Sequence, residues 1–256
     1  MPNAVFTKLQ NAQKTGRKLF ALLIDPDHLR LHHLDQTVAL LRNTAVDLVM
    51  VGGSLLLDER LEECLTYLRS RIHLPILLFP GSALQITDQA DAILLLSLIS
   101  GRNPELLIGQ HVTAAPYLRS SGLEIISTGY MLIDGGRPTT ASYVSHTQPI
   151  PADKPDIAIC TAMAGEMLGL RCLYLDAGSG AIHPVSPEMI RRVRENTQTP
   201  IIVGGGIRTA EQLHERLVAG ADMVVIGHAV EEEPQRLMEL SGVVDRFNAQ
   251  ITRKTV

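Results

Sequence analysis

The chain has 256 residues, close to the roughly 250 that are typical of a closed eight-stranded α/β barrel, so we expect a single domain over residues 1–256. Hydrophobic residues make up 45% of the chain and charged residues 20%, a balance that excludes a disordered or fibrous protein. The net charge is −4 and no block of Lys and Arg stands out, which argues against nucleic acid as a partner.

The cysteines and the N-terminal segment bear on the cellular compartment. Cys64, Cys160 and Cys172 are widely spaced, odd in number and without a metal-ligand pattern, so we expect buried thiols in a reducing compartment. The first twenty residues lack the apolar core of a signal peptide, and no run reaches the roughly 18 apolar residues of a membrane span. The sequence therefore predicts a cytoplasmic protein without a transmembrane segment.

Eight short apolar runs, separated by segments with helix signals, predict the strands of an α/β fold. In chain order the runs are Leu19–Ile24, Leu48–Val51, Ile76–Phe79, Ala92–Leu98, Leu123–Ser127, Cys172–Leu175, Ile201–Val203 and Met223–Ile226. Ser186 and Thr209 can each cap a helix that starts directly after them. Because parallel strands need long crossovers, this alternation favours a single (β/α)8 TIM barrel.

Two segments depart from the alternation. Residues 80–91 leave little room for a crossover helix, so the outer helix after the third strand is predicted to be shortened or missing. The segment from Thr128 to Pro155 is dominated by Gly, Pro, Ser and Thr, which predicts an elaborated loop after the fifth strand. This loop would lie at the catalytic rim of a barrel and could act as a lid.

The strongest functional signal is a pair of glycine-rich turns after the seventh and eighth strands, IIVGGGIRTAEQL (201–213) and ADMVVIGHAV (221–230). Glycines let the backbone approach an anion, and amides at the following helix starts can donate to its oxygens. The turns predict a phosphate site at Gly205, Gly206 and Gly227, and the alternative is two tight turns without a ligand. His228 would contact the ligand through its side chain or only through its backbone amide.

A third turn, YLDAGSGAIHP (174–184), follows the sixth strand. Asp176 could orient a substrate hydroxyl or accept its proton, and Gly178, Ser179 and Gly180 could offer amides to the same phosphate. The alternative is an ordinary Asp/Gly/Ser turn.

Side chains with oxygen atoms that could bind a metal follow the first two strands, in LFALLIDPDHL (19–29) and VMVGGSLLLD (49–58). Asp25 and Ser54 suit Mg²⁺, which is usually held by one or two carboxylates together with substrate phosphates and water. Asp27 could instead cap the following helix, and an Asp-Pro-Asp turn without a catalytic role is the alternative.

Taken together, these motifs resemble the geranylgeranylglyceryl phosphate synthase/heptaprenylglyceryl phosphate synthase family over nearly the whole chain. The resemblance is carried by LIDPDH (23–28), VGGS (51–54), LLFPGS (77–82), SGRNP (100–104), STGYMLIDGG (127–136), YLDAGSGA (174–181), VGGGIR (203–208) and ADMVVIGHA (221–229). The GYMLIDGG and AGSGA forms are more similar to the geranylgeranyl-using branch.

The resemblance implies transfer of a prenyl group from its diphosphate to the C3 hydroxyl of sn-glycerol 1-phosphate, which gives an ether phospholipid precursor. It implies Mg²⁺ on Asp25 and Ser54, and catalysis by Asp176 and Tyr174. The implied glycerol phosphate site comprises Tyr174, Leu175, Asp176, Ala177, Gly178, Ser179, Gly180, Gly205, Gly206, Gly227 and His228. The family more often has Glu in place of Asp176 and Asn in place of His228, which affects the expected substrate geometry and not the reaction class.

A prenyl tail needs an apolar trench, and the truncated third crossover could supply one. Its candidate walls, which suit an ordinary core equally well, are Leu96, Leu98, Ile99, Leu106 and Leu107. We also expect a homo-oligomer and transient membrane contact for product release. A sugar-phosphate isomerase or aldolase-like barrel is the competing enzyme class, disfavoured because only Lys18 lies near a strand, at its N-terminal end. A non-catalytic phosphate-binding protein is the third alternative.

Overall fold

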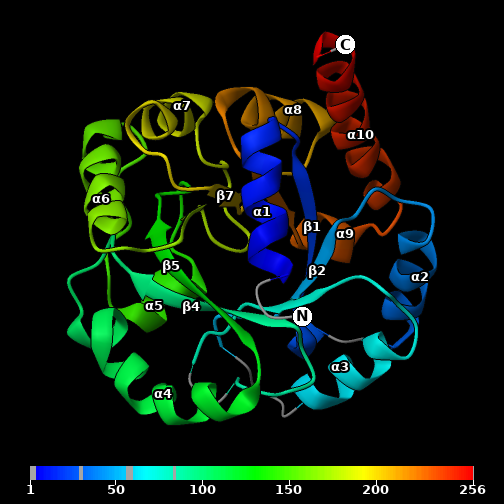
Figure 1. The fold of residues 1–256 in the computed structure, drawn as a ribbon, viewed down its shortest axis with the longest axis horizontal. Helices are drawn as coiled ribbons and strands as arrows, with labels where there is room; N and C mark the ends of the chain where they lie inside the picture. The colour runs from blue at the N-terminus through cyan, green and yellow to red at the C-terminus, as the bar shows by residue number, and fades with distance from the viewer. Residues whose placement is uncertain (1–3, 29–30, 56–59, 83–84, 256) are drawn as a thin grey trace.

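The computed structural model describes residues 4–28, 31–55, 60–82 and 85–255, and its strands form a closed parallel barrel in sequence order (Figure 1). The strands are β1 (Leu19–Ile24), β2 (Leu48–Val51), β3 (Ile76–Leu78), β4 (Ala92–Leu98), β5 (Glu124–Leu132), β6 (Cys172–Asp176), β7 (Ile201–Gly204) and β8 (Met223–Ile226). The barrel closes where β1 pairs with β8, with Leu19 opposite Met223. The predicted TIM barrel is confirmed.

Helices surround the barrel, and a few short ones decorate its ends. They are α1 (Ala4–Thr15), α2 (Leu31–Leu41), α3 (Leu61–Arg69), α4 (Gln110–Ser121), α5 (Thr140–Ser145), α6 (Pro155–Met167), α7 (Pro187–Asn196), α8 (Ala210–Ala219), α9 (His228–Glu232) and α10 (Arg236–Thr255). Ser186 and Thr209 cap α7 and α8 as predicted, each accepting a backbone N–H of the first turn. A 3-10 turn, η1 (Pro26–His28), follows β1, and a π-helical turn, η2 (Glu105–Gly109), precedes α4.

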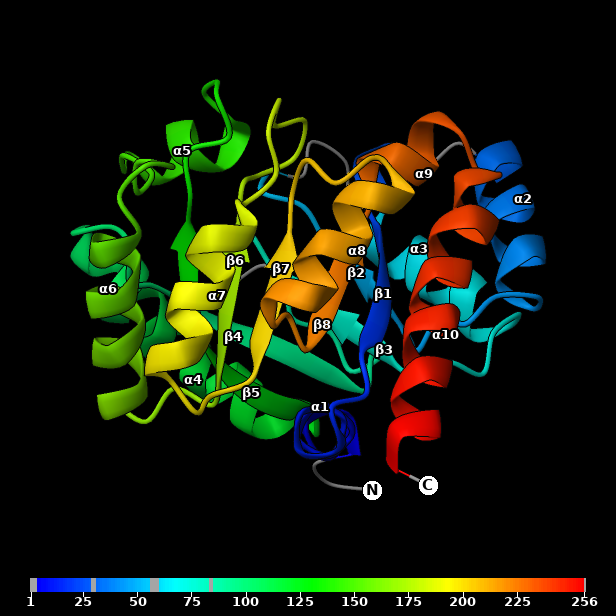
Figure 2. The ribbon, with the colours of Figure 1, turned by 90° about the horizontal axis from the view of Figure 1, so that it is seen from above.

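Helix α1 lies across the N-terminal end of the barrel, opposite α5 and α9 (Figures 1 and 2). The buried Glu124 carboxylate accepts the backbone N–H groups of Val5 and Phe6, at 2.8 and 2.9 Å, and so holds the first turn of the helix. The apolar face of α1 packs on the side chains that fill the barrel interior, such as Leu19 and Met50. The N-terminal end is therefore closed, and a substrate must enter from the other end.

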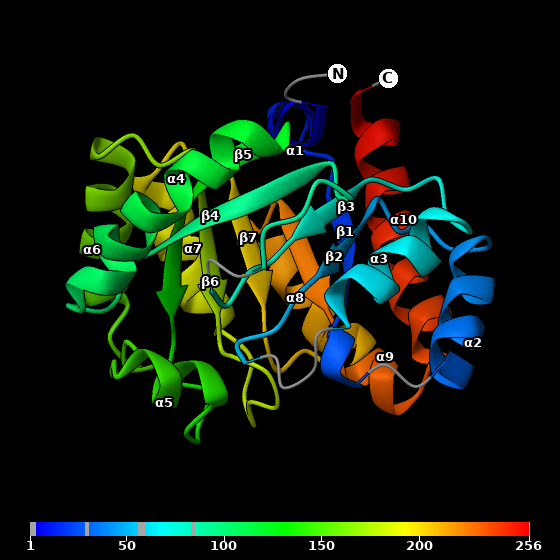
Figure 3. The ribbon, with the colours of Figure 1, turned by 90° about the horizontal axis from the view of Figure 1, so that it is seen from below.

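The pairing between β3 and β4 is short. Only Leu77 and Leu78 of β3 pair with β4, opposite Ala92 and Ile93, whereas β4 pairs with β5 along its whole length. Residues 79–82 and 85–91, the described part of this connection, contain no helix. The predicted loss of the third outer helix is thereby confirmed, and Figure 3 shows β3, β4 and α4 on this side of the molecule.

Strand β5 is longer than predicted, because it continues past Ser127 to Leu132. Thr128 and Gly129 suggested a loop, but the Thr128 hydroxyl is buried and donates to the Ile126 carbonyl at 2.9 Å. A Cβ on Gly129 would lie 3.0 Å from the Leu173 side chain, so glycine lets this neighbour pack closely against the strand. The predicted loop is thus shorter, and it contains α5, whose N-terminus is a capping box of Thr139 and Ser142.

The cysteines differ from the prediction at one position. Cys64 and Cys172 are buried, and burial raises the pKa of each thiol to about 12. Cys160 is exposed on α6, so the expectation of three buried thiols was wrong. Across the described ranges, no helix combines the length and the apolar character that crossing a membrane requires.

Candidate active site

A polar pocket opens at the C-terminal end of the barrel, where the turns after β1, β2, β6, β7 and β8 meet. Most of the predicted site residues line it: Asp25, Ser54, Tyr174, Asp176, Ser179, Gly180, Gly205, Gly206, Gly227 and His228. Leu175 and Ala177 instead belong to the buried core. Gly178 does not line the pocket; its N–H donates to Asp176 Oδ1 at 2.8 Å.

The glycine turns after β6 and β7 are in direct contact. Gly205 and Gly206 have φ angles of 79° and 71°, in the left-handed region that favours glycine. A Cβ on Gly205 would lie 2.5 Å from the Gly178 backbone nitrogen and 2.6 Å from Asp176 Oδ1. Glycine at this position is therefore required by the close approach of two backbone turns.

Several amides at these turns are free to bind an anion. Within the described residues, the N–H groups of Gly180, Gly206 and Gly227 donate to no acceptor of the chain. Helix α8 begins only at Ala210, so after β7 the amides belong to the turn and not, as predicted, to a helix start. Arg208, on the same turn, also lines the pocket and adds a positive charge.

His228 begins α9, and its ring points toward acidic side chains of that helix. Its Nε2 lies 3.3 Å from Glu232 Oε1, and its Nδ1 lies 3.8 Å from Glu231 Oε2. Of the two contacts that the sequence left open for His228, this geometry favours the backbone amide.

Asp176, the last residue of β6, is held from two sides. The Tyr130 hydroxyl donates to Oδ2 at 2.6 Å, and the Gly178 N–H donates to Oδ1. Burial raises the pKa of the Asp176 carboxyl above its usual value, and these two hydrogen bonds oppose the shift. A buried carboxylate with a raised pKa suits proton transfer near neutral pH.

Sequence reasoning missed Tyr130, because the fifth strand was expected to end at Ser127. The available signal was the apolar run of Tyr130 to Ile133 inside the motif STGYMLIDGG, which continues the strand. Asp27, Thr140, Arg208 and Glu231 also line the polar pocket without having been predicted as site residues.

Three aromatic rings, those of Phe79, Tyr130 and Tyr174, pack against one another beside Asp176. The Tyr174 ring stacks on Phe79 with centroids 5.1 Å apart and meets Tyr130 edge-on at 5.6 Å. Burial raises the pKa of the Tyr174 phenol well above its usual value, so the phenol is neutral. Its hydroxyl makes no hydrogen bond within the described part of the chain.

Asp25 and Ser54 lie on neighbouring turns of the polar pocket. A Cβ on Gly53 would be 2.9 Å from Asp25 Oδ2, which places the Asp25 carboxylate against the turn that carries Ser54. Among the described residues, no group of three or more His, Cys, Asp or Glu side chains could hold a metal. One carboxylate and one hydroxyl nevertheless fit Mg²⁺, whose remaining ligands are commonly substrate phosphates and water.

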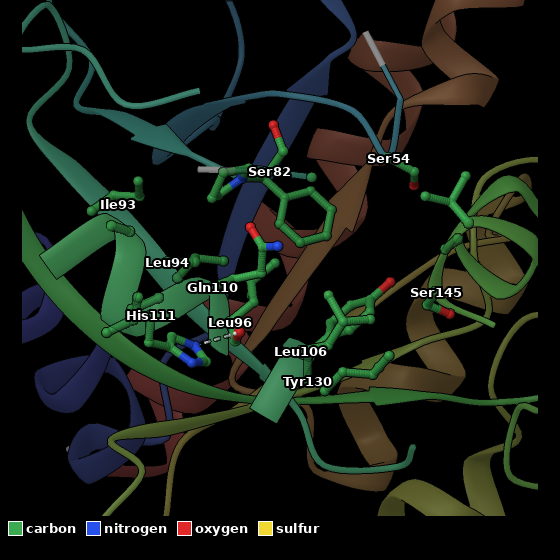
Figure 4. A pocket seen from close by; sticks show the side chains of 18 of the residues that line it. Ser54, Ser82, Ile93, Leu94, Leu96, Leu106, Gln110, His111, Tyr130 and Ser145 are labelled. Carbon is green, nitrogen blue, oxygen red and sulfur yellow. Dashed lines mark hydrogen bonds between the residues drawn. The ribbon is translucent and has the colours of Figure 1, made fainter. Parts of the chain in front are cut away.

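A second, apolar pocket adjoins the polar one at Gly53, Ser54 and Phe79. It runs through the gap between β3 and β4 to Ala114 and Leu118 of α4, and Figure 4 shows its side chains. Of the predicted walls, Leu96, Leu98 and Leu106 line this pocket. Ile99 packs on the far side of the strand against Gly129 and Gly165, and Leu107 lies outside the lining.

This architecture defines a (β/α)8 barrel protein whose polar pocket, built on glycine turns, opens into an apolar pocket. Lys18 lies at the opposite end of the barrel, directly before β1, and no lysine is found among the described residues that line either pocket. The chain belongs to the PcrB family, whose model matches residues 12–245.

Two relatives are similar in sequence to this chain over nearly their whole length. The geranylgeranylglyceryl phosphate synthase of Spirosoma linguale is 53% identical over 250 residues, which cover 96% of this chain and 99% of that protein. The enzyme of the same name from Chitinophaga pinensis is 50% identical, over 95% and 97% of the two chains.

A solved structure is similar in fold as well as in sequence. It is (S)-3-O-geranylgeranylglyceryl phosphate synthase from Thermoplasma acidophilum in complex with its substrate sn-glycerol-1-phosphate. The TM-score is 0.88 at 31% identity, over 95% of this chain and 98% of that one.

Proposed function

We propose that this protein is a prenyltransferase that joins the geranylgeranyl group of its diphosphate to the C3 hydroxyl of sn-glycerol 1-phosphate. The products are an ether phospholipid precursor and diphosphate. The observation that carries the proposal is the junction of the two pockets at Gly53, Ser54 and Phe79. An anionic acceptor and an apolar donor tail can therefore reach one reaction point from two sides.

The glycerol phosphate would occupy the β6–β8 side of the polar pocket. Free amides of Gly180, Gly206, Gly227 and His228, together with the Arg208 charge, would bind the phosphate. The names of the relatives and the ligand of the Thermoplasma acidophilum structure support this choice of acceptor.

Asp25 and Ser54 would hold Mg²⁺ on the other side of the pocket, toward the donor. When bound, the ion would neutralise charge on the diphosphate and make it a better leaving group. The prenyl tail would then extend past Phe79 into the apolar pocket, along Leu96 and Leu98.

In the proposed reaction the bond between C1 of the prenyl group and the diphosphate oxygen breaks, and the C3 hydroxyl oxygen of glycerol phosphate bonds to C1. Asp176 accepts the hydroxyl proton, and Tyr130 holds the Asp176 carboxylate in place for this step. The neutral Tyr174 phenol, which lines the pocket beside Asp176, would orient the glycerol hydroxyl.

Turnover with purified protein tests the proposal. Farnesyl, geranylgeranyl and heptaprenyl diphosphate are offered with sn-glycerol 1-phosphate and Mg²⁺, and sn-glycerol 3-phosphate serves as the matched control acceptor. We expect an ether product with geranylgeranyl diphosphate and sn-glycerol 1-phosphate. Tight binding of glycerol phosphate without turnover would instead indicate a non-catalytic phosphate-binding protein.

We also propose a cytoplasmic location, a homo-oligomer and transient membrane contact. Exposed apolar side chains on and beside α4 and α5 support a surface there that contacts another subunit or a membrane. They are Ile108, Val112, Tyr117, Tyr143 and Val144.

A further inference from the structure

Strand β4 has an open edge beside the apolar pocket. Pairing with β3 stops at Ile93, so from Leu94 onward no described strand covers the β3-facing edge of β4. Leu94, Leu95 and Leu96 line the pocket at this place. A backbone carbonyl left without a partner here would face an apolar environment, which is unfavourable.

His111 supplies a partner to this edge. Its Nε2 lies 2.9 Å from the Leu96 carbonyl oxygen, the contact drawn as a dashed line in Figure 4. A carbonyl can only accept, so Nε2 carries the hydrogen and Nδ1 presents a lone pair when the ring is neutral. Nδ1 is buried and has no hydrogen-bond partner in the described structure.

Helix α4 brings His111 to this position from outside the barrel. The residue follows the π-helical turn η2, and such turns often occur at functional sites because they shift the side chains that follow. Gln110, Ala114 and Leu118 of α4 line the same pocket, so the ring forms part of a continuous wall.

We propose that His111 is a positioning residue for the apolar tail of the substrate, an inference that rests on the proposed function. Its hydrogen bond satisfies the Leu96 carbonyl on the open edge of β4 without water, and so keeps the passage between β3 and β4 suited to a hydrocarbon chain at this point. Without this bond, the Leu96 carbonyl must recruit water or the strand must shift, and either change disfavours the tail. The glycerol phosphate side of the polar pocket, on β6 to β8, does not depend on this bond.

Three substitutions at His111 distinguish the effect of its hydrogen bond from the effect of its side-chain size. His111→Leu removes the donor, and His111→Asn keeps an amide that is too short to reach the carbonyl. His111→Gln places an amide nitrogen near the position of Nε2 and should restore most of the loss. His73→Leu, at an exposed histidine that lines neither pocket, is the matched control.

Calorimetry would measure the Kd of geranylgeranyl diphosphate and of inorganic diphosphate, and kinetics would measure both KM values. In His111→Leu and His111→Asn we expect geranylgeranyl diphosphate to bind roughly ten-fold more weakly, the order expected for one unsatisfied polar group. Inorganic diphosphate binding and the KM for sn-glycerol 1-phosphate should stay near the wild-type values.

The inference would be wrong if the binding of both diphosphates weakened equally, or if His111→Gln did not restore the binding of geranylgeranyl diphosphate. His111 would then have only a structural role. If instead the proposed function is wrong, the wild type forms no ether product. The wild type would then still bind geranylgeranyl diphosphate more tightly than inorganic diphosphate, and His111→Leu would still weaken that preference.

Discussion

The Tyr130 hydroxyl donates a 2.6 Å hydrogen bond to Asp176 Oδ2, and this bond joins the two pockets. Tyr130 lines the apolar pocket and Asp176 lines the polar one. The bond links Asp176, which would accept the proton, to Tyr130, which would contact the donor tail. It also holds the Asp176 carboxylate in place at the end of β6.

Tyr130→Phe should move the pH dependence of turnover to higher pH. Burial raises the pKa of Asp176, and the Tyr130 bond lowers it, so loss of the hydroxyl raises the pKa further. A base must be ionised, and the acid limb of kcat/KM should therefore shift upward, by roughly one to two pH units for a hydrogen bond to a charged group. A pH–rate profile checks this, and an unshifted acid limb would show that Asp176 is not the base.

Asp176→Asn should reduce kcat by about 10²–10⁴-fold, because the amide keeps the size of the side chain but cannot accept a proton. Binding of sn-glycerol 1-phosphate should suffer less, since turn amides would bind the phosphate independently. Asp176→Glu is the companion variant and should retain activity. Steady-state kinetics with saturating prenyl diphosphate measures both, and wild-type turnover in Asp176→Asn would assign the residue to the turn alone.

Asp25→Ala should abolish Mg²⁺-dependent turnover and leave the fold intact, because it removes the only carboxylate that we assign to the ion. We expect a loss of at least about a hundred-fold in kcat/KM, given that a metal stabilises leaving-group charge by several kcal/mol. Titration of activity against Mg²⁺, with circular dichroism as the folding control, measures the effect. Unchanged activity at limiting Mg²⁺ would reject the assignment.

Gly206→Ala should raise the KM for sn-glycerol 1-phosphate, because a side chain is strained at φ 71° and the turn must move its free amide. Gly169→Ala is the matched control: its φ is 81°, and nothing lies within 4 Å of the added Cβ. In thermal unfolding Gly169→Ala should lose on the order of 1 kcal/mol, and Gly206→Ala should lose more, because its Cβ would also lie 3.0 Å from the Pro184 backbone nitrogen. Only Gly206→Ala should show the higher KM, and equal KM values would argue against phosphate binding at this turn.

The sequence by itself determined most of the barrel. The runs Leu19–Ile24, Leu48–Val51, Ala92–Leu98 and Met223–Ile226 coincide with strands from end to end. The reason is physical: a parallel strand in a barrel is buried on both faces, so most of its residues are apolar. The clustering of predicted site residues at one rim follows from the same topology, because all strands of the barrel end there.

The tertiary structure alone decided the features that depend on partners from distant segments. Thr128 and Gly129 extend β5 because they pair with β4 on one side and with Cys172 and Leu173 of β6 on the other, which composition does not reveal. The pairs Tyr130–Asp176 and His111–Leu96 depend on strand register and on where α4 packs. Cys160 is exposed because its side of α6 faces outward. Residue type sets what each side chain can do, but only the three-dimensional packing brings two of them within hydrogen-bonding distance.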